Sequence, residues 1–122
     1  MLGLADLQRR LAAKPSAEAS SPFGPGVIVY KVAGKMFAIV SDDAEDVRFT
    51  LKCDPVLAEV MRGEHAAITP GYHTDKRHWI TIRQDAALPD AEIERLIDHA
   101  YELVRAKLTR AARAALEKAE AL

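Results

Sequence analysis

The side chains best suited to chemistry gather in one short stretch, Thr69–Trp79. It holds two of the four histidines, the single tryptophan, two adjacent cations and a Pro-Gly turn. Lysine and arginine can contact phosphates, while tryptophan, tyrosine and histidine can stack or form hydrogen bonds. Lysines at two predicted strand ends extend this surface if those ends meet the loop. The candidate nucleic-acid-binding residues are Lys35, Lys52, Tyr72, His73, Lys76, Arg77, His78 and Trp79.

The same residues admit other interpretations. Tyr72 and Trp79 would bury against the last helix while the cations solvate the loop. Alternatively, the loop or the exposed end of the last helix would contact a partner protein, because Trp, Tyr and Arg are enriched at protein interfaces. A third alternative is a small-molecule site near Cys53 and His73.

Metal binding and catalysis have weaker sequence support. His73 and His78 are five residues apart, and the chain has neither a Cys-x-x-Cys nor a His-Glu-x-x-His motif. Cys53 stands alone beside Lys52, and a lone cysteine is typical of a small buried hydrophobe. We therefore expect no enzymatic activity, no metal and no cofactor.

Composition limits the partners. Residues 1–122 suit one domain, and 49% of them are hydrophobic. The net charge of −1 argues against coating nucleic acid by bulk electrostatics, although a local basic patch would allow weak or context-dependent DNA binding. The lone cysteine fits a reducing cytosol, and no apolar run reaches the roughly 20 residues of a membrane helix. These features predict a cytoplasmic protein that does not bind membranes.

The first half of the chain predicts one helix and three strands. Leu4, Leu7 and Leu11 keep helical spacing, and the Pro- and Gly-rich connector that follows contains Phe23 as the expected apolar anchor. Residues 27–32 and 35–40 are rich in β-branched and apolar residues, and the Ala-Gly link between them predicts a hairpin. Apolar residues alternate with polar ones over 47–52, which predicts a third strand and an antiparallel meander.

The second half predicts two helices around two strands. Asp54 and Pro55 are typical of a helix start, and Gly63 is expected to close that helix in a left-handed conformation. Short strands are expected at 66–68 and 79–82. A long amphipathic helix is expected from Pro89 to Leu108, with acidic residues early and basic residues late.

Together these elements predict an α+β fold in a single domain. An antiparallel sheet, formed by the meander and a later strand, packs against an N-terminal helix, a short middle helix and a long C-terminal helix. Residues 109–122, which are rich in alanine, are expected to form a helical end that frays or extends beyond the body.

Four motifs in a fixed order resemble the MmcQ/YjbR family. They are Gly34-Lys35-Met36-Phe37-Ala38, Leu51-Lys52-Cys53-Asp54-Pro55, Thr69-Pro70-Gly71-Tyr72-His73 and Lys76-Arg77-His78-Trp79. Leu96-Ile97-Asp98-His99 and Tyr101-Glu102-Leu103-Val104 resemble the family's closing helix, so the likeness runs over about 22–108. Ala100 departs from the pattern, because a serine usually precedes the tyrosine there, and this puts a hydroxyl role on that helix in doubt.

The resemblance implies a frataxin-like α+β fold. It also implies DNA binding of the double-wing kind, in which the sheet rather than a recognition helix meets DNA. The motif positions matching that expectation are Lys35, Lys52, His73, Lys76, Arg77, His78 and Trp79. Iron binding is not carried over, because the sequence lacks a dense acidic ridge.

Overall fold

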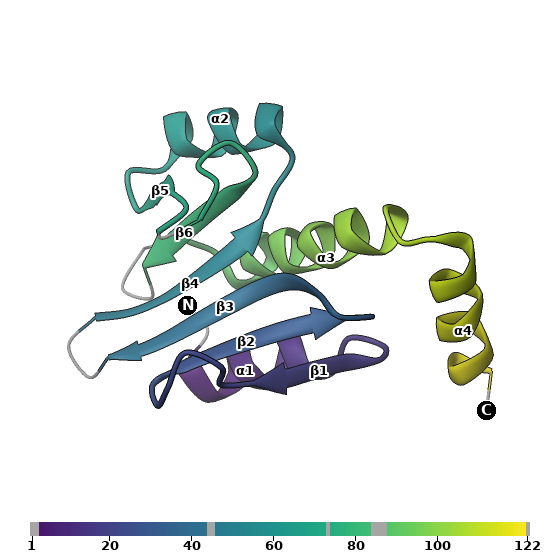
Figure 1. Ribbon diagram of the computed structural model, residues 1–122. Helices are drawn as coiled ribbons and strands as arrows, with labels where there is room; N and C mark the ends of the chain where they lie inside the picture. Colours follow the sequence, from purple (N-terminus) through teal and green to yellow (C-terminus); the bar gives the residue numbers. More distant parts are fainter. Residues whose placement is uncertain (1–2, 44–45, 73, 84–87, 122) are drawn as a thin grey trace.

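Six strands form the centre of the computed structural model, which describes residues 3–43, 46–72, 74–83 and 88–121. The strands are β1 (Ala17–Ser20), β2 (Val27–Val32), β3 (Lys35–Asp43), β4 (Asp46–Lys52), β5 (Ile68–Pro70) and β6 (Trp79–Arg83). They lie side by side in the order β1-β2-β3-β4-β6-β5, and every neighbouring pair is antiparallel (Figure 1). The predicted α+β architecture is confirmed, and the meander is β2-β3-β4.

Four helices accompany the sheet. They are α1 (Leu4–Ala12), α2 (Pro55–Glu64), α3 (Asp90–Ala106) and α4 (Arg110–Glu120). In Figure 1, α1 and α3 both lie behind the sheet, so they cover the same face. Helix α2 contacts β5 and β6, and its Ala58 and Met61 join the core that α1 and α3 cover.

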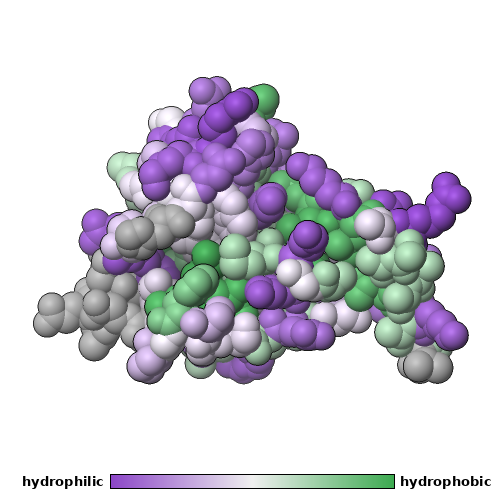
Figure 2. All heavy atoms as spheres, in the orientation of Figure 1, coloured by the Kyte–Doolittle hydropathy of each residue, from purple (hydrophilic) through white to green (hydrophobic). Residues whose placement is uncertain are grey.

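The two faces of the sheet differ in composition because strand residues alternate between them. One row, which belongs to the helix-covered core, is Ile28, Val40, Phe49, Ile82 and Ile68. The neighbouring row on the opposite face is Ser20, Val29, Ile39, Thr50, Thr81 and Thr69. We call this opposite side the helix-free face, since neither α1 nor α3 covers it. Figure 2 shows hydrophilic residues gathered over β5 and β6 and hydrophobic ones over β2 and β3.

The β2–β3 hairpin contains the predicted two-residue turn and an unpredicted bulge. Ala33 and Gly34 have φ angles of 50° and 79°, as tight hairpin turns require. The register shifts between Tyr30 and Lys31, which leaves Phe37 as the extra residue of β3. Phe37 is fully buried, and its ring meets that of Tyr101 on α3 edge to face, with 5.5 Å between centroids.

The connector before β2 differs from expectation. Residues 17–20 form an edge strand, β1, although their small and polar side chains carry no strand signal. Phe23 was expected to anchor the connector, but its side chain is 69% exposed. Gly24 and Gly26, which follow it, have positive φ angles. The tight turn therefore directs this aromatic ring away from the core.

Two helix ends also differ from expectation. Gly63 lies within α2 and does not close it, because the helix runs to Glu64 and His65 caps it in an extended conformation. At the other end, the side chain of Asp54 accepts hydrogen bonds from the backbone N–H groups of Val56 and Leu57, so the predicted start is confirmed.

The C-terminal segment, expected to be a helical end, forms a helix of its own, α4, that is separate from α3. Helix α3 ends at Ala106. The Thr109 hydroxyl then caps α4 by accepting a hydrogen bond from the N–H of Ala112 at 3.1 Å. Leu116 is buried, and the Arg105 guanidinium binds both carboxylate oxygens of Glu120. Among the described helices, none is long and apolar enough to cross a bilayer.

Candidate functional site

Gly71 and Tyr72, which follow β5, lie against the helix-free face of the sheet. The backbone N–H of Gly71 donates to the carbonyl of Trp79 at 3.0 Å. The backbone N–H of Tyr72 donates to the Thr81 hydroxyl at 2.8 Å, and that hydroxyl also bonds the Thr50 hydroxyl at 2.8 Å. The two threonines are the buried polar residues of this face, and they hold Tyr72 against the sheet.

Trp79 is a packing residue on the helix-free face. Its side chain is 7% exposed, and its neighbour Ile80 points into the core on the other side. Trp79 therefore packs against Gly71, whereas burial against the last helix was the expected alternative. Lys52 is its cross-strand partner, and the ammonium of Lys52 lies 5.4 Å from the centre of the indole ring.

A groove on this face combines cations with an aromatic ring. It has a volume of about 410 Å³. Its lining residues are Arg48, Thr69, Pro70, Tyr72, Lys76, Thr81 and Arg83. The Arg48 guanidinium stacks 4.0 Å from the centre of the Tyr72 ring, and Tyr72 remains 47% exposed. We call this the Tyr72 groove.

The Tyr72 groove concentrates positive charge. Arg48 and Arg83 stand directly opposite each other on β4 and β6, and like charges in that arrangement repel. Lys76 adds a third cation, and its ammonium donates to the carbonyl of Gly71 at 2.5 Å. These three cationic side chains make the groove a candidate site for a negatively charged ligand.

The predicted binding residues divide into several locations. Lys76 and Tyr72 line the groove, and Lys52 lies over Trp79, two register positions beyond the groove residue Thr81. Lys35 pairs with the core residue Val32, so the β3 bulge places it on the helix-covered side and not beside Lys52. His73 lies outside the described residues.

Arg77 and His78 face other partners. Arg77 lines a hollow of about 180 Å³ beside α2, together with Pro55, Val56, Glu59 and Arg62. The ring nitrogen Nδ1 of His78 lies 2.8 Å from the Asp75 carboxylate. The pKa of Asp75 is lowered, first by the hydrogen bond from the Arg77 backbone N–H and then by the one from His78. A carboxylate thus accompanies two of the predicted cationic positions.

Two groove residues, Arg48 and Arg83, were missed by sequence reasoning. The alternation in the third strand already placed Arg48 among the residues facing water, and Arg83 directly follows the last predicted strand. Their convergence was not visible, because β4 and β6 are separated in sequence by α2 and β5.

Cys53 lies in the core, which weakens the small-molecule alternative. Its side chain is 1% exposed. Burial, reinforced by the negative charge of Asp54, raises the pKa of the thiol to about 11, although Arg62 opposes the shift. A protonated, buried thiol is a poor nucleophile.

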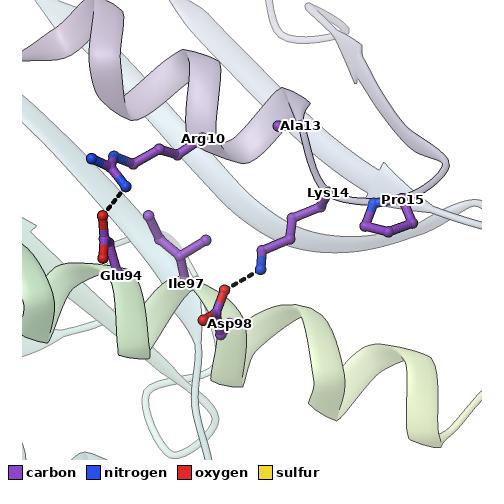
Figure 3. Close-up of a pocket in the computed structure, with 7 residues that line it drawn as sticks. All are labelled: Arg10, Ala13, Lys14, Pro15, Glu94, Ile97 and Asp98. Atoms are coloured by element: carbon purple, nitrogen blue, oxygen red, sulfur yellow. Dashed lines mark hydrogen bonds and ion pairs between the residues drawn. The ribbon is translucent and has the colours of Figure 1, made fainter.

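A second hollow, between α1 and α3, has balanced charges. It has a volume of about 350 Å³, and Figure 3 shows its lining residues. Arg10 pairs with Glu94 and Lys14 pairs with Asp98 across it. These pairs join the two helices and balance the charges of this hollow.

Comparisons with known proteins place the chain in a family. The sequence profile of the YjbR family matches residues 12–103. Protein YjbR of Escherichia coli K12 is 34% identical over 99 residues, which cover 81% of this chain and 84% of that protein. Protein YbdF of Escherichia coli O157:H7 is 35% identical over 103 residues, covering 83% and 84%.

Solved structures agree. The crystal structure of Deinococcus radiodurans protein DR2400 has a TM-score of 0.88 at 32% identity and covers 96% of this chain and 89% of its own. A Pseudomonas syringae protein has a TM-score of 0.73 at 23% identity, covers 84% and 98%, and shares the fold. With its sequence motifs, the profile match and these relatives taken together, the chain belongs to the YjbR family.

Proposed function

We propose that this protein binds DNA through its helix-free face, with the Tyr72 groove as the main contact. The observation that carries this proposal is the convergence of Arg48, Lys76 and Arg83 around the half-exposed ring of Tyr72. Phosphate contacts by Lys and Arg supply most of the affinity of sequence-independent DNA binding. A groove with three cations supports weak binding, in keeping with a net charge of −1.

The sheet also offers a broad surface beside the groove. Lys52 lies on the same face next to Trp79, and Lys31 lies on that face of β2 because Tyr30 and Val32 on either side point into the core. These lysines lie on strands on either side of β3 and extend the positive surface beyond the groove. This arrangement supports contact through a sheet, which is the double-wing mode that the resemblance implies.

Charge removal tests the proposal. We expect the double variant Arg48→Gln, Arg83→Gln to weaken binding to a labelled DNA duplex or single strand, measured by fluorescence anisotropy over a salt series. The slope of log affinity against log salt should fall by about 1 for each lost phosphate contact. The matched control is Arg110→Gln, Lys118→Gln. It also removes two positive charges, but from α4, which lies away from β4 and β6 in Figure 1. Equal effects of both double variants would refute the proposal.

Two neighbouring cations give a sharper comparison. Lys76 lines the groove, whereas Arg77 lies beside α2 with Glu59 close by. We expect Lys76→Ala to lower DNA affinity and the salt slope, and Arg77→Ala to leave both nearly unchanged. The reverse order, measured in the same anisotropy assay, would place the DNA contact on the α2 side instead.

A protein-interaction surface is the second candidate function. Val56 and Val60 lie one helical turn apart on the outer side of α2 and are 70% and 47% exposed. Exposed apolar side chains beside Arg62 and Arg77 suit a protein contact. A single stoichiometric partner that co-purifies after nuclease treatment, and is lost in Val56→Ser, Val60→Ser, would support this candidate.

A further inference from the structure

The Tyr72 groove has a shape that distinguishes between forms of DNA. Its volume of about 410 Å³ falls in the range of small-molecule pockets, roughly 300–1,000 Å³. Its three cations surround one concavity. A duplex presents its phosphates along two ridges and keeps its bases stacked inside, so only an unpaired nucleotide can enter a concave site of this kind with both its base and its phosphate.

The aromatic ring points to the same conclusion. Tyr72 is 47% exposed, and its ring is stacked on the guanidinium of Arg48. The flat face of an exposed aromatic ring gains most from an unpaired base, because proteins that bind single strands combine a positive groove with rings on which bases stack. The Arg48 guanidinium covers one face of the ring to form a stacking platform, so a base stacks on the ring's other face or on the outer side of the guanidinium, since guanidinium groups also stack on planar groups.

The platform is held in place before any ligand arrives. The Tyr72 backbone is bonded to the Thr81 hydroxyl, and Thr81 is bonded in turn to Thr50. Gly71 packs so closely on Trp79 that an added Cβ would lie 2.5 Å from the Trp79 Cβ. A preorganised aromatic ring loses little conformational freedom on binding, which favours affinity.

We propose that the Tyr72 groove receives one unpaired nucleotide of a DNA strand, so that the protein prefers single-stranded DNA to duplex. The base stacks on the platform of Tyr72 and Arg48, and the flanking phosphates meet Arg83 and Lys76. This inference rests on the proposed DNA-binding function and names the form of DNA that the site takes.

The test compares four probes by fluorescence anisotropy and competition. They are a labelled oligothymidylate, a duplex of equal length, an oligouridylate of equal length and free thymidine monophosphate. We expect the oligothymidylate to bind most tightly. Tyr72→Leu should weaken its binding about tenfold, while Tyr72→Phe, which keeps the ring, stays close to the parent protein. Duplex binding should change little in either variant.

The outcomes separate the inference from the proposed function. If the duplex binds as tightly as the single strand and Tyr72→Leu has no effect, the single-strand inference is overturned, but the proposed DNA binding is not. Tighter binding of oligouridylate, or binding of the mononucleotide as tight as that of the strand, also overturns it. No binding of either DNA probe refutes the proposed function itself. Thermal unfolding monitored by circular dichroism confirms that both Tyr72 variants are folded.

Discussion

At the scale of single residues, chemical type predicts less than position does. Lys76 and Arg77 are adjacent cations, yet Lys76 lines the Tyr72 groove and Arg77 lies beside α2. Trp79 is of a residue type common in binding sites, but its side chain is buried against Gly71. Tyr72 was predicted to bind alongside Trp79, and nearly half of its surface is exposed. Burial therefore decides which of these residues can meet a ligand.

The residue-scale prediction concerns Cys53. Burial leaves its side chain 1% exposed and raises its pKa to about 11, so we expect the native thiol to react very slowly with Ellman's reagent at mildly alkaline pH. In denaturant, one thiol per chain should react at once, since the chain has one cysteine. Because the folded pKa lies above the ordinary thiol value, the reaction rate of the native thiol should keep rising with pH up to about 11, beyond the pH at which an ordinary thiol reaches its plateau. Rapid reaction of the native protein at neutral pH would contradict this account.

At the scale of elements, irregularities in strands and loops position the site. The bulge in β3 turns Phe37 into the core and reverses the faces of the residues before it, which separates Lys35 from Lys52. Gly71 has no side chain, so the backbone at this residue can approach Trp79 closely. Both features depend on backbone geometry and leave no periodic signal in the sequence.

Two glycine substitutions test the element scale. A Cβ at Gly71 would lie 2.1 Å from the Thr74 hydroxyl and 2.5 Å from the Trp79 Cβ, so Gly71→Ala should lower the free energy of unfolding by about 1–3 kcal/mol. The matched control is Gly63→Ala in α2, where the new Cβ meets nothing within 4 Å. That change should raise the free energy of unfolding by about 0.5 kcal/mol, because alanine favours helix. Urea titration measures both, and a Gly71→Ala protein as stable as the parent would refute the close approach.

At the scale of the whole molecule, one face of the sheet packs the core and the other carries the Tyr72 groove. Helices α1 and α3 cover one face, where the core lies, and the two ion pairs of Figure 3 tie these helices together. The opposite face carries the threonine row, Trp79 and the Tyr72 groove. This division lets the protein display cations locally while its net charge stays near zero.

The whole-molecule prediction maps binding onto one face. When isotope-labelled protein is titrated with oligothymidylate, we expect amide chemical-shift changes in β4, β6 and residues 69–76. The amides of α1 and α4 should move little and serve as the internal control, because these helices lie away from β5 and β6 in Figure 1. Changes confined to the outer side of α2, around Val56 and Arg62, would contradict binding in the groove.

The sequence by itself determined most elements and the family. Local patterns suffice for these, because hydrophobic periodicity, the Ala-Gly turn and the Asp54 cap each act within a few residues. Strand β1, the bulge and the separation of α4 from α3 escaped prediction, since weak local signals there are overridden by pairing and packing with distant segments. Four motifs in a fixed order were enough to indicate the YjbR family from the sequence alone.

Only the tertiary structure decided the composition of the candidate site. Arg48 and Arg83 meet because β4 pairs with β6 across an intervening helix and strand, a contact that strand alternation cannot reveal. Lys35 leaves the group because one extra residue in β3 reverses its face. Alternation tells which residues share a face within one strand, but only the register between strands brings cations from distant segments around Tyr72.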